Sequence, residues 1–203
     1  MLFVLIVLLL VASVFVLLMK KNRESLCLLG MCCSLMVQFS GILIFIAKKG
    51  GYSRSIINFL FFSQALRNKL QYLFVTLDAL GYIIAVGRYL FPLFLLESAL
   101  QYSMIGWIRR HPDIQKWICV LPAATLAVYF PPVFRFIVSR WPVMHSVLVE
   151  GSYWWITAYV AVALVLMIQE LFAITMRFCR KQFVGIVGCH LALSGLYLLY
   201  CGQ

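Results

Sequence analysis

The sequence predicts an all-α fold, a polytopic membrane bundle of about six transmembrane helices plus an interfacial helix. Hydrophobic residues make up 65% of the 203 positions and charged residues only 11%, whereas soluble domains average about 45–50% and about 25%. The mean hydropathy is +1.01, and a soluble fold of this composition would expose large apolar patches to water. The Lys and Arg residues also gather in short runs between long apolar stretches, as in the loops that flank membrane helices.

The apolar stretches are long enough to cross a membrane, which takes about 20 residues. Leu2–Met19 has basic residues after it and none before it, the reverse of a cleavable signal peptide, so we expect a retained helix with its N-terminus outside. Between Tyr52 and Trp107 no clear loop is present, and we expect an interfacial helix over Ser55 to Leu66 that could extend to Ala85. The expected crossings are Leu2–Met19, Leu26–Ala47, Arg88–Trp107, Trp117–Val138, Tyr153–Met176 and Phe183–Cys201.

The basic residues indicate how the bundle is oriented in the cell membrane. The segments Lys20–Glu24, Arg109–Lys116 and Arg177–Lys181 hold nine Lys and Arg residues, against seven on the other side. Because cytoplasmic loops are enriched in Lys and Arg, we expect these three segments to be cytoplasmic. The net charge of +11 therefore belongs to membrane-flanking loops, and we expect no nucleic-acid partner because no soluble domain carries a basic stripe.

Ionisable residues inside the apolar stretches are the candidates for a functional site, because a charge in the membrane core is costly. Glu97 and Gln101 are four residues apart and share one helix face, where they would line a ligand cavity or hydrogen-bond a neighbouring helix. Glu170 and His190 are each ten residues from Arg180, so an antiparallel helix pair turning there would hold them at one depth. Such a pair would sense protons or a ligand, or hold the hairpin together.

Other features are interpreted as structural. Small residues recur over Gly30–Gly41 and Gly185–Gly195, where helix backbones can approach closely. Arg88 is interpreted as reaching the membrane interface, with Asp78 at the same interface, and the aromatic-rich stretch from Arg135 to Trp155 would form an outside loop and the mouth of a site. The seven Cys residues lack disulfide or zinc-site spacing, and we expect no catalytic residue, cofactor or metal.

Two stretches carry a resemblance to a known family. One is Lys69-Leu70-Gln71-Tyr72-Leu73, and the other runs from Arg88 to Ser103, contains Pro92 and ends in Ala99-Leu100-Gln101-Tyr102-Ser103. They resemble the N-terminal seven-helix membrane sensor region of bacterial sensor histidine kinases. A short basic loop, Ile108–Lys116, follows as in that family, whereas the apolar run Phe74–Gly87 separates the two matched parts. Tyr197–Gln203 would fall just before a seventh helix.

The resemblance implies a membrane-embedded sensory module of a two-component signalling histidine kinase. It would relay a ligand or the state of the membrane to a cytoplasmic domain outside this chain, and any kinase activity would belong to that domain. Residues 1–203 would be a single transmembrane helical domain, a fragment or sensor module of a longer chain. Its partners would be the lipid bilayer, a small or lipophilic ligand and a second copy, with Glu97, Gln101, Glu170 and His190 as ligand-binding or sensing residues.

Three other functions stay open at this point. A small transporter or an intramembrane enzyme would use the intramembrane carboxylates and His190 to relay protons or hold a substrate, although the chain shows no internal repeat of the kind common in transporters. A structural subunit of a larger membrane complex would use the small-residue stripes for packing.

Overall fold

The structure, a computed structural model, describes residues 2–18, 22–49, 60–61, 64–103, 111, 113–174 and 177–201. Every element within these residues is an α-helix and none is a strand, so the all-α prediction is confirmed. The helices are α1 (Leu2–Leu18), α2 (Arg23–Lys49), α4 (Gln64–Gln71), α5 (Leu77–Tyr102), α7 (Ile114–Tyr129), α8 (Pro131–Arg140), α9 (Val143–Ala173) and α10 (Arg177–Cys201).

The chain is a multi-pass membrane protein, and its described residues hold fewer full-length crossings than the sequence predicted. Helices α2, α5 and α9 and residues Phe183–Tyr200 of α10 are long and apolar enough to span a membrane. Helices α7 and α8 meet at a bend of 73° and add a fifth span if they act as one. Helix α1 has 17 residues, about 26 Å of helix, which is shorter than a hydrocarbon core of about 30 Å. The described residues thus hold four to five spans and the short apolar α1.

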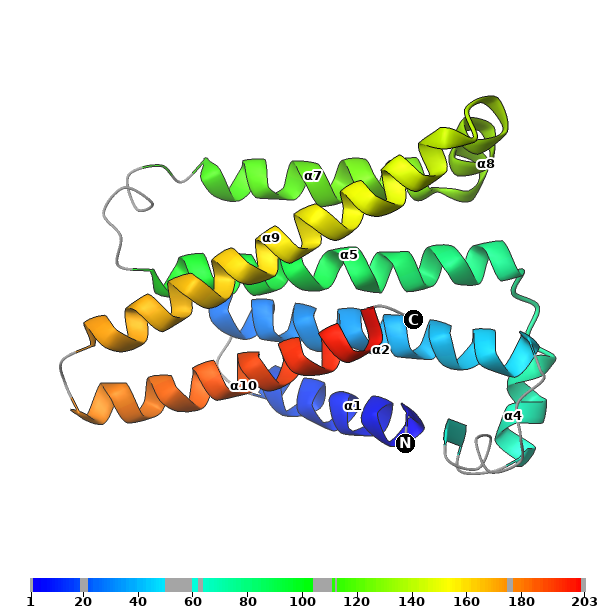
Figure 1. Ribbon diagram of the computed structural model, residues 1–203. Coiled ribbons are helices and arrows are strands. Elements are labelled where there is room, and N and C mark those ends of the chain that lie inside the picture. The colour runs from blue at the N-terminus through cyan, green and yellow to red at the C-terminus, as the bar shows by residue number, and fades with distance from the viewer. Residues whose placement is uncertain are drawn as a thin grey trace.

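The helices of the bundle lie side by side, with α9 crossing the others obliquely (Figure 1). The last residues of α1, α5 and α9 and the first residues of α2, α7 and α10 all lie at one end of the bundle, which we call the basic end. These helix ends flank the three basic segments that were expected to share one side of the membrane. Helices α4 and α8 lie at the opposite end (Figure 1).

Small residues bring α2 and α5 into close contact. A Cβ added at Gly87 of α5 would lie 2.5 Å from the carbonyl oxygen of Ser34 and 2.6 Å from the amide nitrogen of Gln38 in α2. Gly30 and Gly41 of α2 also contact side chains of α5, so this stripe packs against a helix as predicted. Gln38 is fully buried at the crossing, and its side-chain amide has no hydrogen-bond partner among the described residues.

The small residues of α10 do not pack in this way. A Cβ added at Gly185, Gly188 or Gly195 would meet no atom within 4 Å, so the packing prediction is wrong for this stripe within the part of the chain that the structure describes. Helix α10 contacts α5 through large side chains instead. The ring of Tyr197 stacks on that of Phe91 with a centroid distance of 4.5 Å.

A proline inside α5 frees a backbone carbonyl, which α10 binds. Pro92 has no N–H to donate to the carbonyl of Arg88, four residues earlier in the helix. The hydroxyl of Tyr197 donates a hydrogen bond to that carbonyl oxygen at 2.9 Å. Because lipid offers no hydrogen bonds, a neighbouring helix has to supply the missing donor.

The same arrangement recurs between α7 and α9. Pro122 lies inside α7 and leaves the carbonyl of Ile118 without its helical partner. The hydroxyl of Tyr159 in α9 donates to that oxygen at 2.9 Å. Helices α5 and α7, each with an internal proline, are therefore joined to a neighbour through a tyrosine hydroxyl, which allows each proline to lie at membrane depth.

The middle of the chain differs from the prediction. The crossing expected at Arg88–Trp107 begins at Leu77, where the hydroxyl of Thr76 accepts a hydrogen bond from the first turn and caps the helix. Residues Leu77 to Ala85 therefore belong to the spanning helix rather than to an interfacial one. Helix α4 overlaps the expected interfacial segment only at residues 64–66, and residues 55–59, 62–63 and 104–110 lie outside the described residues.

The expected outside loop from Arg135 to Trp155 is also helical. Pro131 and Pro132 end α7, but they also occupy the first turn of α8, where a helix does not need their missing N–H groups. Helix α8 is followed almost at once by α9, which begins at Val143. The prediction of a loop is wrong because a proline pair can begin a helix as well as end one.

Candidate functional site

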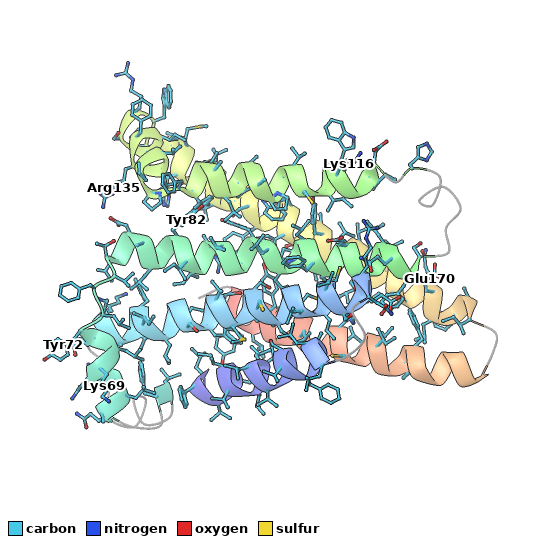
Figure 2. The ribbon with its side chains drawn as sticks, turned by 180° about the vertical axis from the view of Figure 1, so that it is seen from behind. Lys69, Tyr72, Tyr82, Lys116, Arg135 and Glu170 are labelled. Carbon is cyan, nitrogen blue, oxygen red and sulfur yellow. The ribbon has the colours of Figure 1, made fainter. Side chains whose placement is uncertain are left out.

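A cavity of about 330 Å³ lies at the end of the bundle opposite the basic end, between α5, α8, α9 and the end of α7. Figure 2 shows two of its lining residues, Tyr82 and Arg135, far from Lys116 and Glu170 at the basic end. The volume is in the usual range for small-molecule sites, about 300–1,000 Å³. The lining is mostly aromatic and apolar and includes Leu77, Gly81, Tyr82, Ile84, Ala85, Tyr89, Tyr129, Pro131, Phe134, Val149 and Tyr153.

Arg88 is the basic residue at the inner end of this cavity. It lies 11 residues after the start of α5 and 14 before its end, so its Cα is about 16 Å and about 21 Å from the two helix ends. No other Lys or Arg occurs in α5. A spanning helix therefore carries a cation close to its middle, where charged side chains are rare and usually functional. The prediction that places Arg88 at the interface disagrees with this position.

The guanidinium of Arg88 is held by an aromatic ring but is not neutralised. It lies over the ring of Tyr153 in α9, 5.4 Å from the centroid, a favourable cation–π position. Its Nε is buried and has no hydrogen-bond partner among the described residues. The ion pairs found in the described chain join other side chains. Arg88 therefore brings an unused donor and an uncompensated positive charge to the cavity.

An ion pair joins the two helices at the outer part of the cavity. Asp78, in the first turn of α5, pairs with Arg135 of α8, and both residues line the cavity. Both side chains are half exposed or more, so the pair contributes little stability by itself. Its effect on the cavity is electrostatic, because the two charges cancel and leave Arg88 as the dominant charge.

Aromatic packing keeps the inner wall in place. The ring of Tyr89 lies between Tyr129, at a centroid distance of 5.3 Å, and Trp155, at 5.6 Å. Tyr129 in turn stacks on Phe134 at 5.1 Å. Contacts of this kind add to the stability of apolar burial, and they connect α5, α7, α8 and α9 around the cavity. The wall is thus preformed rather than assembled from loops.

Two of the predicted sensing residues, Glu97 and Gln101, lie away from this cavity. The cavity lining on α5 ends at Tyr89, and Glu97 is eight residues further on, about 12 Å along the helix. Gln101 donates its amide to Sγ of Cys27 in α2 at 3.2 Å, and Glu97 is close enough for its charge to act on the same thiol. Gln101 therefore contacts α2 near the basic end, whereas the charge of Glu97 acts on thiols of both α2 and α7.

Glu170 and His190 do not form the predicted pair. Helix α9 ends at Ala173 and α10 begins at Arg177, so the turn is centred about five residues earlier than expected. Glu170 is three residues before the end of α9, and His190 is thirteen residues after the start of α10. The difference of ten residues corresponds to about 15 Å of depth, which is too far for a direct contact.

His190 instead joins α10 to α5. Its side chain is buried, with 3% exposed, and Nδ1 donates to the carbonyl oxygen of Ile186 at 2.8 Å. Its Nε2 lies 2.9 Å from Oγ of Ser98 in α5. Glu170 is buried as well, with 5% exposed. The contacts of His190 are those expected of a polar group that fixes helix packing in a membrane.

The sequence contains one signal for the cavity, which is Arg88. It is an ionisable residue within a long apolar run, which by default marks a functional site, and an interfacial position does not explain it. The expected mouth over Arg135 to Trp155 was closer to the structure, since Arg135, Ser152 and Tyr153 do line the cavity. The four-helix lining itself has no local pattern in the sequence.

Comparisons of the chain with protein-family models, with curated proteins and with solved structures find no match to it. Among the described residues, no group of three or more His, Cys, Asp or Glu side chains could hold a metal ion. The polar groups that line the cavity are the tyrosine hydroxyls, Ser152, the Asp78–Arg135 pair and the guanidinium of Arg88.

Proposed function

We propose that this chain is a membrane-embedded sensory module whose ligand binds in the cavity lined by Arg88. The observation that carries the proposal is the unused, buried Nε donor of Arg88 in a cavity of ligand size. A cation near the middle of a spanning helix is destabilising unless it binds something. A convergent polar group in an otherwise apolar cavity is the usual composition of a small-molecule site.

Arg88 also connects the cavity to α10. Its side chain lines the cavity, and its carbonyl oxygen accepts the hydrogen bond from Tyr197 of α10. A ligand that binds two helix arrangements unequally would therefore act on α5 and α10 together. Such a shift fits the resemblance to sensor histidine kinases, in which it would pass to a cytoplasmic kinase domain outside these residues.

Filling the cavity with a side chain tests this proposal without a known ligand. Gly81 lines the cavity, and a Cβ there would meet no atom within 4 Å, so Gly81→Leu should narrow the cavity without a clash. We expect the distance between spin labels at Lys116 and Phe172, both exposed and near the basic end, to change by about 1–2 Å, as helices do in switching proteins. Pulsed electron paramagnetic resonance on a cysteine-free chain in nanodiscs measures it.

Gly151→Leu is the matched control. Gly151 lies in α9, has equally open surroundings and does not line the cavity, so its substitution should leave the label distance unchanged. If Gly81→Leu and Gly151→Leu give the same distance distribution as the wild-type chain, the cavity is not coupled to the basic end and the sensory proposal is wrong.

A small transporter is the second candidate, because the bend between α7 and α8 lies beside the cavity. Tyr129, at the end of α7, and Pro131, at the start of α8, both line it. Broken helices next to a binding site are typical of transporters. Uptake of radiolabelled phenyl phosphate, which does not cross lipid unaided, into proteoliposomes would favour transport. A label shift without uptake would favour the sensor.

A further inference from the structure

We propose that the ligand of this cavity is a small molecule with one carboxylate or phosphate group and an apolar body, and that Arg88 binds its anionic group. The inference rests on the proposed function, since it names the ligand class of the same site. Asp78 and Arg135 neutralise each other, and the remaining charge in the lining is Arg88.

The geometry around Arg88 suits an anion in particular. A guanidinium presents donors in a planar fork that matches a carboxylate or phosphate. The ring of Tyr153 covers one face of the group, which leaves the donors at its edge for a ligand, and Nε is one donor without a partner among the described residues. A neutral or cationic ligand would leave the charge of Arg88 uncompensated, which is costly at membrane depth.

The walls of the cavity determine the chemistry of the ligand beyond its anionic group. Apart from Arg88, Ser152 and the Asp78–Arg135 pair, the lining consists of aromatic and small or aliphatic residues, which favour an apolar chain or ring. On α5 the lining runs from Leu77 to Tyr89, about 18 Å along the helix. The anionic end would therefore lie at the inner end of the cavity, with the apolar body extending towards the Asp78–Arg135 pair.

Decanoate and decanol, which share one carbon chain and differ in charge, provide the test. The full chain in phosphatidylcholine nanodiscs at pH 8 should bind radiolabelled decanoate about 10- to 100-fold more tightly than decanol, after subtraction of uptake by empty nanodiscs, because hydrogen bonds to charged groups are the stronger ones. Arg88→Gln should abolish this preference by weakening decanoate binding, and the decanol binding that remains shows that the variant folds. Arg88→Lys keeps the charge without the fork and should retain part of the preference.

Arg140→Gln is the matched control, because it removes the same charge from the exposed last turn of α8, outside the cavity lining. It should keep the full preference. Equal affinities for decanoate and decanol in the wild-type chain, or an unchanged preference in Arg88→Gln, would overturn the anion proposal. Neither result affects the label distance measured in Gly81→Leu, so failure of the anion proposal can be distinguished from failure of the proposed function.

The anion can come from water or from a lipid headgroup, and a second arm separates these sources. Phosphatidylglycerol added to the nanodiscs should displace decanoate if the site takes a lipid headgroup. Decanoate binding that persists would assign the site to a dissolved anion. Both results support an anionic ligand, provided that the Arg88→Gln chain shows neither binding preference nor displacement.

Discussion

Tyr197→Phe should lower the free energy of unfolding by about 1–3 kcal/mol, although it removes a single hydroxyl group. The hydroxyl donates to the Arg88 carbonyl that Pro92 leaves without a helical partner. The variant keeps the ring that stacks on Phe91, so the loss reports the hydrogen bond rather than the packing. In lipid no water can replace the donor. Unfolding by sodium dodecyl sulfate in mixed micelles measures the change.

Pro92→Ala supplies the matching background. Alanine restores an N–H that can donate to Arg88, so the tyrosine hydroxyl becomes redundant. We expect Tyr197→Phe to have a much smaller effect in Pro92→Ala than in the wild-type chain, with a coupling of about 1 kcal/mol or more in the double-mutant cycle. Tyr159→Phe in a Pro122→Ala background repeats the test between α7 and α9. Equal losses in both backgrounds would show that the hydroxyl does not act through the carbonyl.

Gly87→Ala should destabilise the bundle by about 1–3 kcal/mol through overpacking. A methyl group at this position would meet backbone atoms of α2, Ser34 O at 2.5 Å and Gln38 N at 2.6 Å. Backbone atoms cannot rotate away as a side chain would, so α2 and α5 have to separate. The same unfolding titration measures the loss.

Gly81→Ala makes the identical change in the same helix, six residues earlier. A Cβ at Gly81 would meet no atom within 4 Å, so the variant should gain about 0.5–1 kcal/mol from the higher helix propensity of alanine. The two substitutions should therefore move stability in opposite directions. A loss of similar size in both would mean that helix propensity or lipid contacts, and not the α2–α5 contact, determine the effect.

The parts of the fold that local pattern determines could be predicted from the sequence. Composition and apolar length gave the helical membrane class, and the spacing from Gly30 to Gly41 gave the face of α2 that packs. The start of α5 was harder to predict, because no clear loop divides the stretch from Tyr52 to Trp107. In the structure Asp78 is neutralised by Arg135, a residue that is distant in the sequence.

The predicted site failed where it depended on register between helices. In an antiparallel hairpin, moving the turn by five residues brings one helix position five residues closer to the turn and takes the other five residues further away. The relative depth of the two positions therefore changes by ten residues. Because of this difference in depth, Glu170 does not reach His190, and His190 lies beside Ser98 instead. The shape of the cavity could not be predicted, because Arg88, Tyr129, Arg135 and Tyr153 come from four helices and meet only through tertiary packing.

The depth of Arg88 has an electrical consequence. Moving one charge across the whole membrane changes its free energy by about 2.3 kcal/mol per 100 mV. An anion that reaches Arg88, near the middle of α5, would cross roughly half of that field, which corresponds to about a sevenfold change in affinity at 100 mV. Ligand binding would then depend on the membrane voltage. The sign of that dependence would identify the side of the membrane from which the cavity is filled.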